Sequence, residues 1–289
     1  MKILILGANG LLGGACYRLM TQVPNLEVLG SVRSKLDKSA KSSQQLIGSI
    51  DVLDAERLDQ LFAENKPQVV INCTSLSKSI MNDADPLRFI ELYSMLPHRL
   101  ARLCSRYSAR LIHISSDGVF SGKKGNYKEI DKADADDLYG RSKFLGEVTG
   151  PNCITIRTSI IGHDNSLQNG LISWYLSNKY SCKGYTKAIF SGLPACVLAQ
   201  ILVDFVILNP NLKGIYHIGS DPISKFDLLN LIGNVYSSES ILVPDDSVRL
   251  DRSLNTTKFE NETGYSAPSW RDLVLLMHND FLANNLGIN

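Results

Sequence analysis

The feature that most constrains this fold is an apolar run that ends abruptly in a glycine-rich turn. Ile3 to Leu6 are consecutive apolar residues, and Gly7-Ala8-Asn9-Gly10-Leu11-Leu12-Gly13 follows them. Consecutive apolar positions suit a strand that is covered on both faces of a parallel sheet. Glycines let the backbone turn tightly and approach a pyrophosphate at the positive end of the next helix. The residues predicted to bind a dinucleotide here are Gly7, Asn9, Gly10, Leu11, Leu12 and Gly13.

Short apolar runs alternate with amphipathic stretches through the first half of the chain. The predicted strands are Lys2–Leu6, Glu27–Val32, Val69–Cys73, Arg110–Ile114 and Cys153–Arg157. The predicted helices are Leu11–Val23, Ala55–Asn65, Leu87–Tyr107 and Leu138–Thr149. Pro97 should kink or split the third of these helices. The alternation predicts an α/β fold, a Rossmann-type doubly wound parallel sheet with right-handed crossovers.

The pattern loosens after about residue 160. The elements expected there are helices at Ile172–Leu176, Cys196–Leu208, Phe226–Tyr236 and Trp270–Leu282, and a strand at Gly214–Ile218. Ser224 and Asp227 have the spacing of a capping box. We expect a dinucleotide-binding Rossmann domain over 1–160 and a smaller mixed α/β substrate-binding part over 161–289, within which the chain can return to the first domain. Ligands should bind at the carboxyl ends of the strands.

Composition and charge exclude several classes of function. The 289 residues carry a formal net charge of +1, which gives no bulk attraction to nucleic acid or to an anionic membrane. Six cysteines show no CxxC pair, so we expect free thiols, no metal and a reducing compartment. No apolar stretch reaches the roughly 18–20 residues that span a bilayer. A cytoplasmic location is expected.

The end of the second predicted strand should read the adenosine ribose of the cofactor. Arg33 and Lys35 stand there, where an acidic residue would favour NAD. A guanidinium with a nearby ammonium suits a 2′-phosphate, so NADP(H) is preferred and NAD(H) is the alternative. Asp51 and its neighbour Val52 are candidate contacts to the adenine. The competing interpretation is that Arg33 and Lys35 are solvated surface charges and Asp51 is an ordinary loop acid.

Tyr139-Gly140-Arg141-Ser142-Lys143 places a tyrosine and a lysine one turn apart on a helix face. A free tyrosine titrates near pH ~10, and a neighbouring ammonium lowers its pKa. Tyr139 could then give a proton to a ketone oxygen, while Lys143 bonds the nicotinamide ribose and a hydroxyl of Ser115 or Ser116 holds the substrate oxygen. A second copy of the spacing, Tyr175 to Lys179, lacks the preceding strand and hydroxyls, and is interpreted as structural.

Several further segments give a resemblance to a known family. They are Val70-Ile71-Asn72, Ser115-Ser116-Asp117-Gly118-Val119-Phe120, Tyr127-Lys128-Glu129, Gly146-Glu147, Ile156-Arg157-Thr158-Ser159, Arg252–Phe259 and Pro268-Ser269-Trp270. With the glycine turn and the Tyr139 motif, they make nearly the whole chain resemble the extended short-chain dehydrogenase/reductase superfamily, and within it the dTDP-4-dehydrorhamnose reductase branch.

The resemblance implies NADPH-dependent reduction of the C4 ketone of a nucleotide-linked 4-keto-6-deoxy sugar, in the synthesis of deoxysugar precursors of surface polysaccharides. It implies the catalytic set Ser116, Tyr139 and Lys143. It adds to the cofactor site Cys73, Thr74, Ser75, Ser115, Thr158 and Ile160. The substrate contacts that it implies are Ser116, Asp117, Val119, Tyr139 and Arg252. Arg252 would face the nucleotide diphosphate, and the alternative for both Arg252 and Asp117 is a structural bond within the fold. A second copy of the chain is a candidate partner.

The chain departs from the family pattern at two positions. Gly118 stands where an aromatic residue is usual, which could widen the sugar pocket. Tyr93 stands where the family often keeps an asparagine, which puts a water-relay or helix-kink role in doubt. Two alternatives stay open: a nucleotide-sugar epimerase or dehydratase with bound NAD, and a non-catalytic dinucleotide-binding regulatory subunit. The latter resembles the β subunit of methionine adenosyltransferase.

Overall fold

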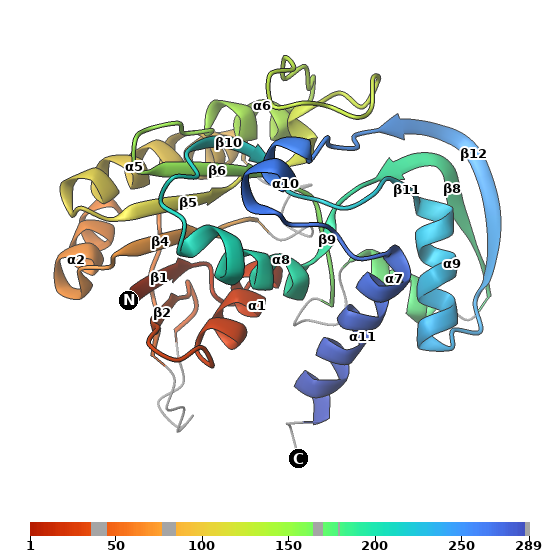
Figure 1. Ribbon diagram of the computed structural model, residues 1–289, viewed down its shortest axis with the longest axis horizontal. Helices are drawn as coiled ribbons and strands as arrows, with labels where there is room; N and C mark the ends of the chain where they lie inside the picture. The colour runs from red at the N-terminus through yellow and green to blue at the C-terminus, as the bar shows by residue number, and fades with distance from the viewer. Residues whose placement is uncertain (36–44, 77–84, 164–169, 179, 287–289) are drawn as a thin grey trace. The chain divides into compact units, whose positions relative to one another are not determined.

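The computed structural model describes residues 1–35, 45–76, 85–163, 170–178 and 180–286 of the chain (Figure 1). The chain divides into two compact units of three segments each. The first comprises Met1–Ser115, Asp137–Ile156 and Ala199–Ile215, and the second Ser116–Asp136, Arg157–Leu198 and Tyr216–Asn289. Among the described residues, no helix combines the length and apolar character needed to cross a membrane.

A seven-stranded sheet in the order β10-β6-β5-β4-β1-β2-β3 organises the fold. Its strands are β1 (Lys2–Leu6), β2 (Glu27–Ser31), β3 (Leu46–Ile47), β4 (Val69–Asn72), β5 (Arg110–Ile114), β6 (Cys153–Arg157) and β10 (Gly214–His217). The neighbouring pairs from β6 through β3 are parallel. Because β1 continues to β2 on one side while β4 lies on its other side, the strand order reverses at β1, as in a doubly wound sheet. The predicted α/β fold class is confirmed.

The predicted strands form because their side chains can be buried. Ile3, Leu4, Ile5 and Leu6 are completely buried in β1, and every residue of β4 and β6 is buried. The core of the first unit includes Leu4, Leu6, Val70 and Leu111 from the sheet. Apolar residues of helices α2 and α5 complete it.

Helices connect the strands of the first unit, and local signals fix their ends. They are α1 (Leu11–Met20), α2 (Ala55–Asn65), α4 (Pro86–Phe89), the π-helix η1 (Ile90–Met95), α5 (Leu96–Arg106), α6 (Leu138–Leu145) and the π-helix η3 (Leu202–Ile207). The helix α8 (Ala195–Ile201) begins in the second unit and ends in the first. The Asp54 side chain caps α2 by accepting from the Arg57 N–H, and Lys66 ends the helix in the left-handed region with φ 46°.

The irregularity expected at Pro97 takes a specific form. The predicted Leu87–Tyr107 helix is built of α4, η1 and α5, and it changes to π-helical bonding just before the proline. Pro97 has no N–H to donate to the Tyr93 carbonyl four residues earlier. The Leu96 N–H bonds to the carbonyl of Glu91, five residues back, which is the π-helical spacing.

The described residues of the second unit contain two smaller sheets. A three-stranded sheet has the order β11-β8-β12, with β8 (Ser181–Phe190), β11 (Ile223–Ser224) and β12 (Ile241–Asp251). β7 (Ile160–Ile161) pairs with β9 (Leu193–Pro194). The other elements are the 3-10 turn η2 (Asp117–Val119) and the helices α7 (Leu171–Ser177), α9 (Lys225–Tyr236), α10 (Thr257–Thr263) and α11 (Trp270–Leu286).

The capping box predicted at the start of α9 is present. The Ser224 hydroxyl accepts from the Asp227 N–H at 3.0 Å. Of the second Tyr-to-Lys spacing, Tyr175 lies buried in α7, whereas Lys179 lies outside the described residues.

Candidate functional site

The glycine turn lies at the carboxyl end of β1, beside the end of β4. Gly7 has φ +80°, and a Cβ on it would lie 3.2 Å from the carbonyl oxygen of Cys73. A Cβ on Gly13 would overlap the carbonyl oxygen of Gly7, so the packing of α1 against the turn requires glycine there. A Cβ on Gly10 would meet only that same carbonyl oxygen, at 3.4 Å, which is ordinary contact. Packing within the protein therefore does not account for glycine at position 10.

This turn fits the pyrophosphate of a dinucleotide. Gly10 caps α1 and has no side chain of its own that could bond the N–H groups of the first turn. Asn9 is exposed, Leu11 is partly buried, and Leu12 and Gly13 are buried. The backbone of residues 10 to 13 is thus the part of the predicted set that can face an anion, with the positive end of α1 behind it.

The end of β2 is tied to the glycine turn through its backbone. The Ser31 carbonyl accepts from the N–H groups of Gly7 and Ala8, at 3.2 and 3.0 Å. Arg33 and Lys35, two residues and four residues further on, are exposed. The structure therefore brings Arg33 to the strand end that should read the ribose, with an accessible side chain.

Asp51 and Val52 follow β3 and precede α2. Asp51 is exposed, and its carboxylate accepts from the Leu53 N–H at 3.0 Å. Val52 is partly buried and packs against the core. Asp51 thus has a local structural bond, and its contact with the adenine stays a prediction.

The end of β4 carries a chain of hydrogen bonds. The amide of buried Asn72 lies 3.1 Å from Nδ1 of His113, and its oxygen accepts from the Thr74 hydroxyl at 2.6 Å. Because the Asn72 oxygen accepts from Thr74, its amide nitrogen donates to His113, whose Nδ1 must be unprotonated. Burial is the main reason that the pKa of His113 lies well below its usual value. Cys73 and Thr74 are half-buried and Ser75 is exposed at this edge.

Tyr139 and Lys143 lie on α6, as predicted, and share one face of it. The Asp137 side chain fixes the start of the helix by accepting from the Gly140 N–H at 2.7 Å. Tyr139 is half-buried, and Lys143 is 5 % exposed. The Lys143 ammonium donates to the carbonyl of Ile114, the last residue of β5, at 2.8 Å. This bond holds Lys143 at the same edge of the sheet as the glycine turn.

Lys143 is a buried cation with a modified acidity. Burial lowers the pKa of Lys143 to about 8, while Glu147 and Cys73 act in the opposite direction. At neutral pH the side chain therefore stays mainly charged. Ser115 donates to Glu147 at 2.8 Å. The sequence interpretation gave no role to Glu147, although its position after the Tyr139 motif was the available signal.

Ser116, the third residue of the predicted catalytic set, belongs to the second unit. Its hydroxyl accepts from the Gly118 N–H at 2.9 Å and lies 3.2 Å from the Asp117 carboxylate, to which it donates. Burial raises the pKa of Asp117, against the influence of Arg252 and Lys225. Ser116, Asp117 and Arg252 are therefore neighbours within this unit. Lys225, the first residue of α9, is a further cation near Asp117 that the sequence interpretation missed.

The other predicted residues of the second unit are mostly buried. Thr158 is 3 % exposed, and its carbonyl accepts from the Asp117 N–H at 3.1 Å. Ile160 begins β7 and is half-buried. Val119 is completely buried in a small core with Phe120 and Tyr127. A substrate contact through Val119 stays a prediction, which this burial does not favour.

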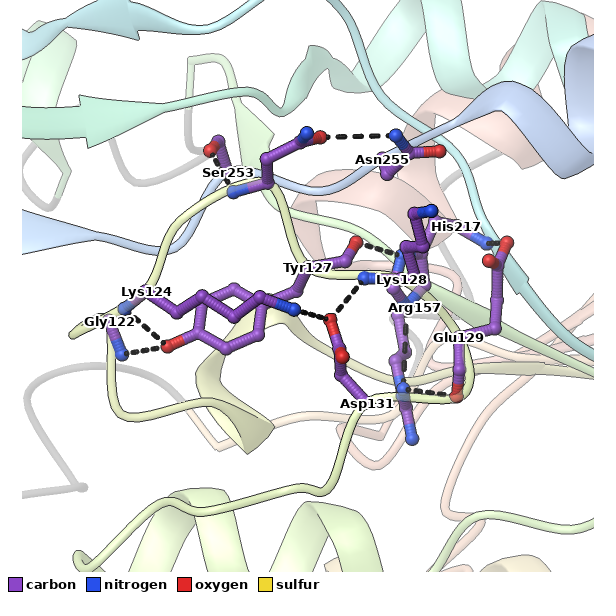
Figure 2. Close-up of polar contacts among 11 residues, drawn as sticks. Gly122, Lys124, Tyr127, Lys128, Glu129, Asp131, Arg157, His217, Ser253 and Asn255 are labelled. Carbon is purple, nitrogen blue, oxygen red and sulfur yellow. Dashed lines mark hydrogen bonds and ion pairs between the residues drawn. The ribbon is translucent and has the colours of Figure 1, made fainter.

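A polar and aromatic cluster holds the Tyr127–Glu129 segment in place, and Figure 2 shows its polar contacts. The rings of Phe120 and Tyr127 are stacked 4.1 Å apart, and the Arg157 guanidinium lies 5.0 Å from the Phe120 ring centroid. Arg157 donates to Nε2 of His217 at 3.3 Å, while Nδ1 of His217 donates to the Tyr127 carbonyl at 3.0 Å. Both bonds together require neutral His217 with its proton on Nδ1.

The charge state of His217 agrees with this bonding. Burial and the Arg157 guanidinium lower the pKa of His217 to about 3. The Glu129 carboxylate accepts from the backbone N–H of His217 at 3.0 Å. The segments that gave the family resemblance at Phe120, Tyr127 to Glu129 and Arg157 are thus structural partners of one another, and His217 joins them.

Comparison with known proteins identifies the family. The RmlD substrate binding domain matches residues 1–282. A probable low-salt glycan biosynthesis reductase of Haloferax volcanii is 26% identical over 94% of this chain and 95% of its own. A dTDP-4-dehydrorhamnose reductase of Aggregatibacter actinomycetemcomitans is 27% identical over 94% of this chain and 90% of its own. The methionine adenosyltransferase 2 subunit β of Rattus norvegicus is 24% identical over 83% of this chain and 73% of its own.

A solved structure has the same fold. The dTDP-4-dehydrorhamnose reductase of Bacillus anthracis, solved in complex with NADP, has a TM-score of 0.78 at 19% identity, covering 96% of this chain and 99% of that one. The predicted resemblance and the predicted oxidoreductase class are confirmed. The chain belongs to the RmlD substrate binding domain family, within the extended short-chain dehydrogenase/reductase superfamily of NAD(P)-dependent oxidoreductases.

Proposed function

We propose that this protein is an NADPH-dependent reductase of the C4 ketone of a nucleotide-linked 4-keto-6-deoxy sugar. The observation that carries the proposal is the placement of Tyr139 and buried Lys143 on one face of α6. Lys143 is bonded to the end of β5 in the sheet whose β1 end carries the glycine turn. This arrangement supports a proton donor beside a dinucleotide.

Each residue has a distinct role in this proposal. Tyr139 gives its phenolic proton to the ketone oxygen, and the Lys143 ammonium stabilises the phenolate that remains. Ser116 donates a hydrogen bond to the substrate by turning its hydroxyl proton away from the Asp117 carboxylate, to which it donates in the free protein. When bound, the reduced nicotinamide supplies the hydride that completes the alcohol. Tyr139 regains its proton from solvent after the step.

Residues of the second unit support a nucleotide diphosphate as the part of the substrate that the protein recognises. Arg252 and Lys225 lie near buried Asp117 in the same unit as Ser116. Two cations near one buried carboxyl leave positive charge for a diphosphate. The name of one relative, a dTDP-4-dehydrorhamnose reductase, favours the same substrate class.

The preference for NADPH over NADH depends on Arg33. Its side chain is exposed at the end of β2, where a 2′-phosphate would lie. We propose NADPH as the physiological reductant.

The test is NADPH oxidation, followed by absorbance, against dTDP-, UDP-, GDP- and CDP-linked 4-keto-6-deoxy sugars. Rapid oxidation with one member, and much slower oxidation with NADH, is expected. The Tyr139→Phe variant is the matched control for non-enzymatic oxidation. If the protein binds NADPH but oxidises it with none of these sugars, the reductase assignment is contradicted.

Two alternatives make different predictions. An epimerase or dehydratase would hold NAD through purification and convert a sugar without net oxidation of NADPH. A regulatory subunit, as the similarity to methionine adenosyltransferase 2 subunit β suggests, would bind the dinucleotide, oxidise none of it with any sugar and associate stably with a larger enzyme. Product analysis and co-purification separate these outcomes.

A further inference from the structure

Tyr93 connects two parts of the first unit that the proposed reaction uses. It lies in η1 and is 1 % exposed. The backbone around it is fixed against α6, because the Ser94 hydroxyl donates to the Ser142 carbonyl at 3.0 Å. A Cβ on Gly146 would overlap the Tyr93 carbonyl oxygen, so η1 and the end of α6 are in direct backbone contact. The ring of Tyr93 therefore has a defined position relative to the residues of α6.

The hydroxyl of Tyr93 holds the segment that follows β4. It accepts from the Leu76 N–H at 2.8 Å and lies 3.1 Å from the Ser75 hydroxyl. Cys73, Thr74 and Ser75 are the residues predicted to lie along the cofactor. A hydrogen bond from a buried phenol to this segment restricts its conformation.

The ring of Tyr93 contacts the catalytic pair. Its centroid lies 5.4 Å from that of Tyr139, with the ring planes at 85°, and the Lys143 ammonium lies 5.1 Å from it. A cation within roughly 6 Å of an aromatic face is attracted to the ring. Burial disfavours the charged form of Lys143. The Tyr93 ring and the Ile114 carbonyl both favour the charged form and so oppose the effect of burial.

We propose that Tyr93 is a positioning residue: its ring keeps Lys143 charged and in place beside Tyr139, and its hydroxyl anchors Ser75–Leu76 on the cofactor side. This role rests on the proposed function. Tyr93 acts through Lys143 and Ser75 and does not itself transfer a proton.

The other groups near Lys143 must be kept constant in a test. Glu147 and Cys73 raise the pKa of Lys143, and the pKa of His113 is lowered in part by Lys143 itself. Glu147 and His113 belong to elements that the Tyr93 hydroxyl does not bond. Cys73 precedes the segment that this hydroxyl bonds, so Tyr93→Phe, which loses the same bonds, controls for a change at Cys73. The matched control is Phe89→Leu, which removes a buried ring 5.6 Å from that of Tyr93 on the same helix.

The first measurement is the Lys143 titration by NMR in protein labelled with [6-13C]lysine, the signal being assigned by its absence in Lys143→Arg. Tyr93→Leu should lower the midpoint by about 0.5–1 pH unit. Tyr93→Phe, which keeps the ring, and Phe89→Leu should leave it unchanged. An unchanged or raised midpoint in Tyr93→Leu would overturn the role of the ring. If Tyr93→Leu does not fold, Tyr93→Met fills the space with a flexible apolar chain and makes the same prediction.

The second measurement is NADPH affinity by fluorescence. Tyr93→Phe should raise the dissociation constant about 5–10-fold, because it loses the hydroxyl bonds and nothing else. Tyr107→Phe, which removes a hydroxyl that donates to Asp59 elsewhere in the first unit, should leave it unchanged. Equal affinity in Tyr93→Phe and the parent would overturn the anchoring role.

Turnover separates this proposal from the proposed function. With an active sugar, the alkaline limb of the kcat/KM profile should move in Tyr93→Leu by the same shift as the NMR titration. If the Lys143 midpoint moved in Tyr93→Leu but the alkaline limb of kcat/KM did not, Tyr93 would have no effect on catalysis through Lys143. A parent protein that turns over no sugar contradicts the reductase assignment, whereas the NMR and affinity results are obtained without turnover.

Discussion

At the scale of single residues, the proposed chemistry depends on the one phenolic proton of Tyr139. Tyr139→Phe keeps the ring, and hence its edge contact with Tyr93, but has no proton to give. We expect kcat to fall by about 10²–10⁴-fold, the usual contribution of a general acid, with the dissociation constant for NADPH changed less than twofold. Stopped-flow oxidation and fluorescence titration measure the two quantities. Near-normal turnover would remove Tyr139 from the mechanism.

Arg33 is the residue on which cofactor choice depends. Arg33→Asp replaces a cation that suits a 2′-phosphate with a carboxylate that accepts from a 2′-hydroxyl. The ratio of kcat/KM for NADPH to that for NADH should fall by at least tenfold. Lys35→Ala, at an exposed position nearby, is the control and should change the ratio less. An unchanged ratio in Arg33→Asp would place the cofactor ribose elsewhere.

Much of the candidate site could be predicted because its signals are local. Glycines after a strand and a Tyr-to-Lys spacing on a helix need only a few residues to be recognised. The contacts of Tyr93 and Lys225 could not be predicted in this way. Each depends on side chains from elements distant in sequence, and no motif marks them. In the sequence, Tyr93 stood out only as a departure from the family pattern, and that departure did not predict which residues it contacts.

At the scale of elements, the apolar strands of four or five residues were predictable, whereas the two-residue strands and the polar ones were not. β1, β5, β6 and α2 have the bounds that the sequence predicts. β8 and β12, the long strands of the three-stranded sheet, were missed. In β12 a proline and two aspartates interrupt the apolar pattern, and its pairing with β8 shifts register between Asp245 and Arg249. Such strands are specified by their partner more than by their own residues.

The glycine turn allows folding and cofactor binding to be separated within one element. Gly13→Ala should destabilise the fold by several kcal/mol, on the order of 2–4, because its Cβ overlaps the Gly7 carbonyl oxygen. Gly10→Ala should cost about 1 kcal/mol or less, since its Cβ makes only ordinary contact. It should nevertheless weaken NADPH binding by at least tenfold, because the methyl group stands where the pyrophosphate approaches.

Chemical denaturation and fluorescence titration of the two variants test this separation. Gly150→Ala, where the nearest atom to a Cβ is the Cys153 sulfur at 3.5 Å, is the control for adding a methyl group. If Gly10→Ala bound NADPH as tightly as the parent, the turn would not be the pyrophosphate site.

At the scale of the whole molecule, the two units are interleaved along the chain. Residues 199–215 belong to the same unit as residues 1–115. Arg110 at the start of β5 donates to the carbonyls of Val206 and Leu212, which lie in that returning segment. A fragment of residues 1–160 would leave this guanidinium without those acceptors. The functional boundary near residue 160 stays a prediction, but the first unit needs chain from beyond it.

Two buried histidines should make the stability of the whole molecule depend on pH. The pKa of His217 is lowered to about 3 and that of His113 lies well below its usual value, in both cases mainly because of burial. Each ring also accepts a hydrogen bond, from Arg157 and Asn72 respectively, that protonation would break. In the unfolded chain both should titrate near pH ~6.5.

The direction of this pH dependence follows from the difference between the folded and unfolded pKa values of the two histidines. Below pH ~6.5 these histidines bind protons in the unfolded chain but not in the folded chain. Their contribution to stability is therefore fully present above that pH, and it is lost as the pH falls toward their pKa values in the folded state. Each of these two histidines contributes a slope of up to about 1.4 kcal/mol per pH unit, so together they should lower the free energy of unfolding by about 2–4 kcal/mol between pH 6.5 and 5. His163, whose pKa burial lowers to about 4, adds to this loss. Asp117, whose pKa is raised by burial, opposes this loss only at the acidic end of the range.

Urea unfolding at pH 7.5, 6.5, 5.5 and 5 measures the slope. His217→Asn keeps a donor near Nδ1 but cannot titrate, so it should be less stable than the parent at pH 7.5 and lose stability less steeply on acidification. A parent whose stability is flat from pH 7.5 to 5 would mean that the buried rings accept protons in the folded state. The neutral tautomer assigned to His217, with the network around Tyr127 and Arg157, would then be wrong.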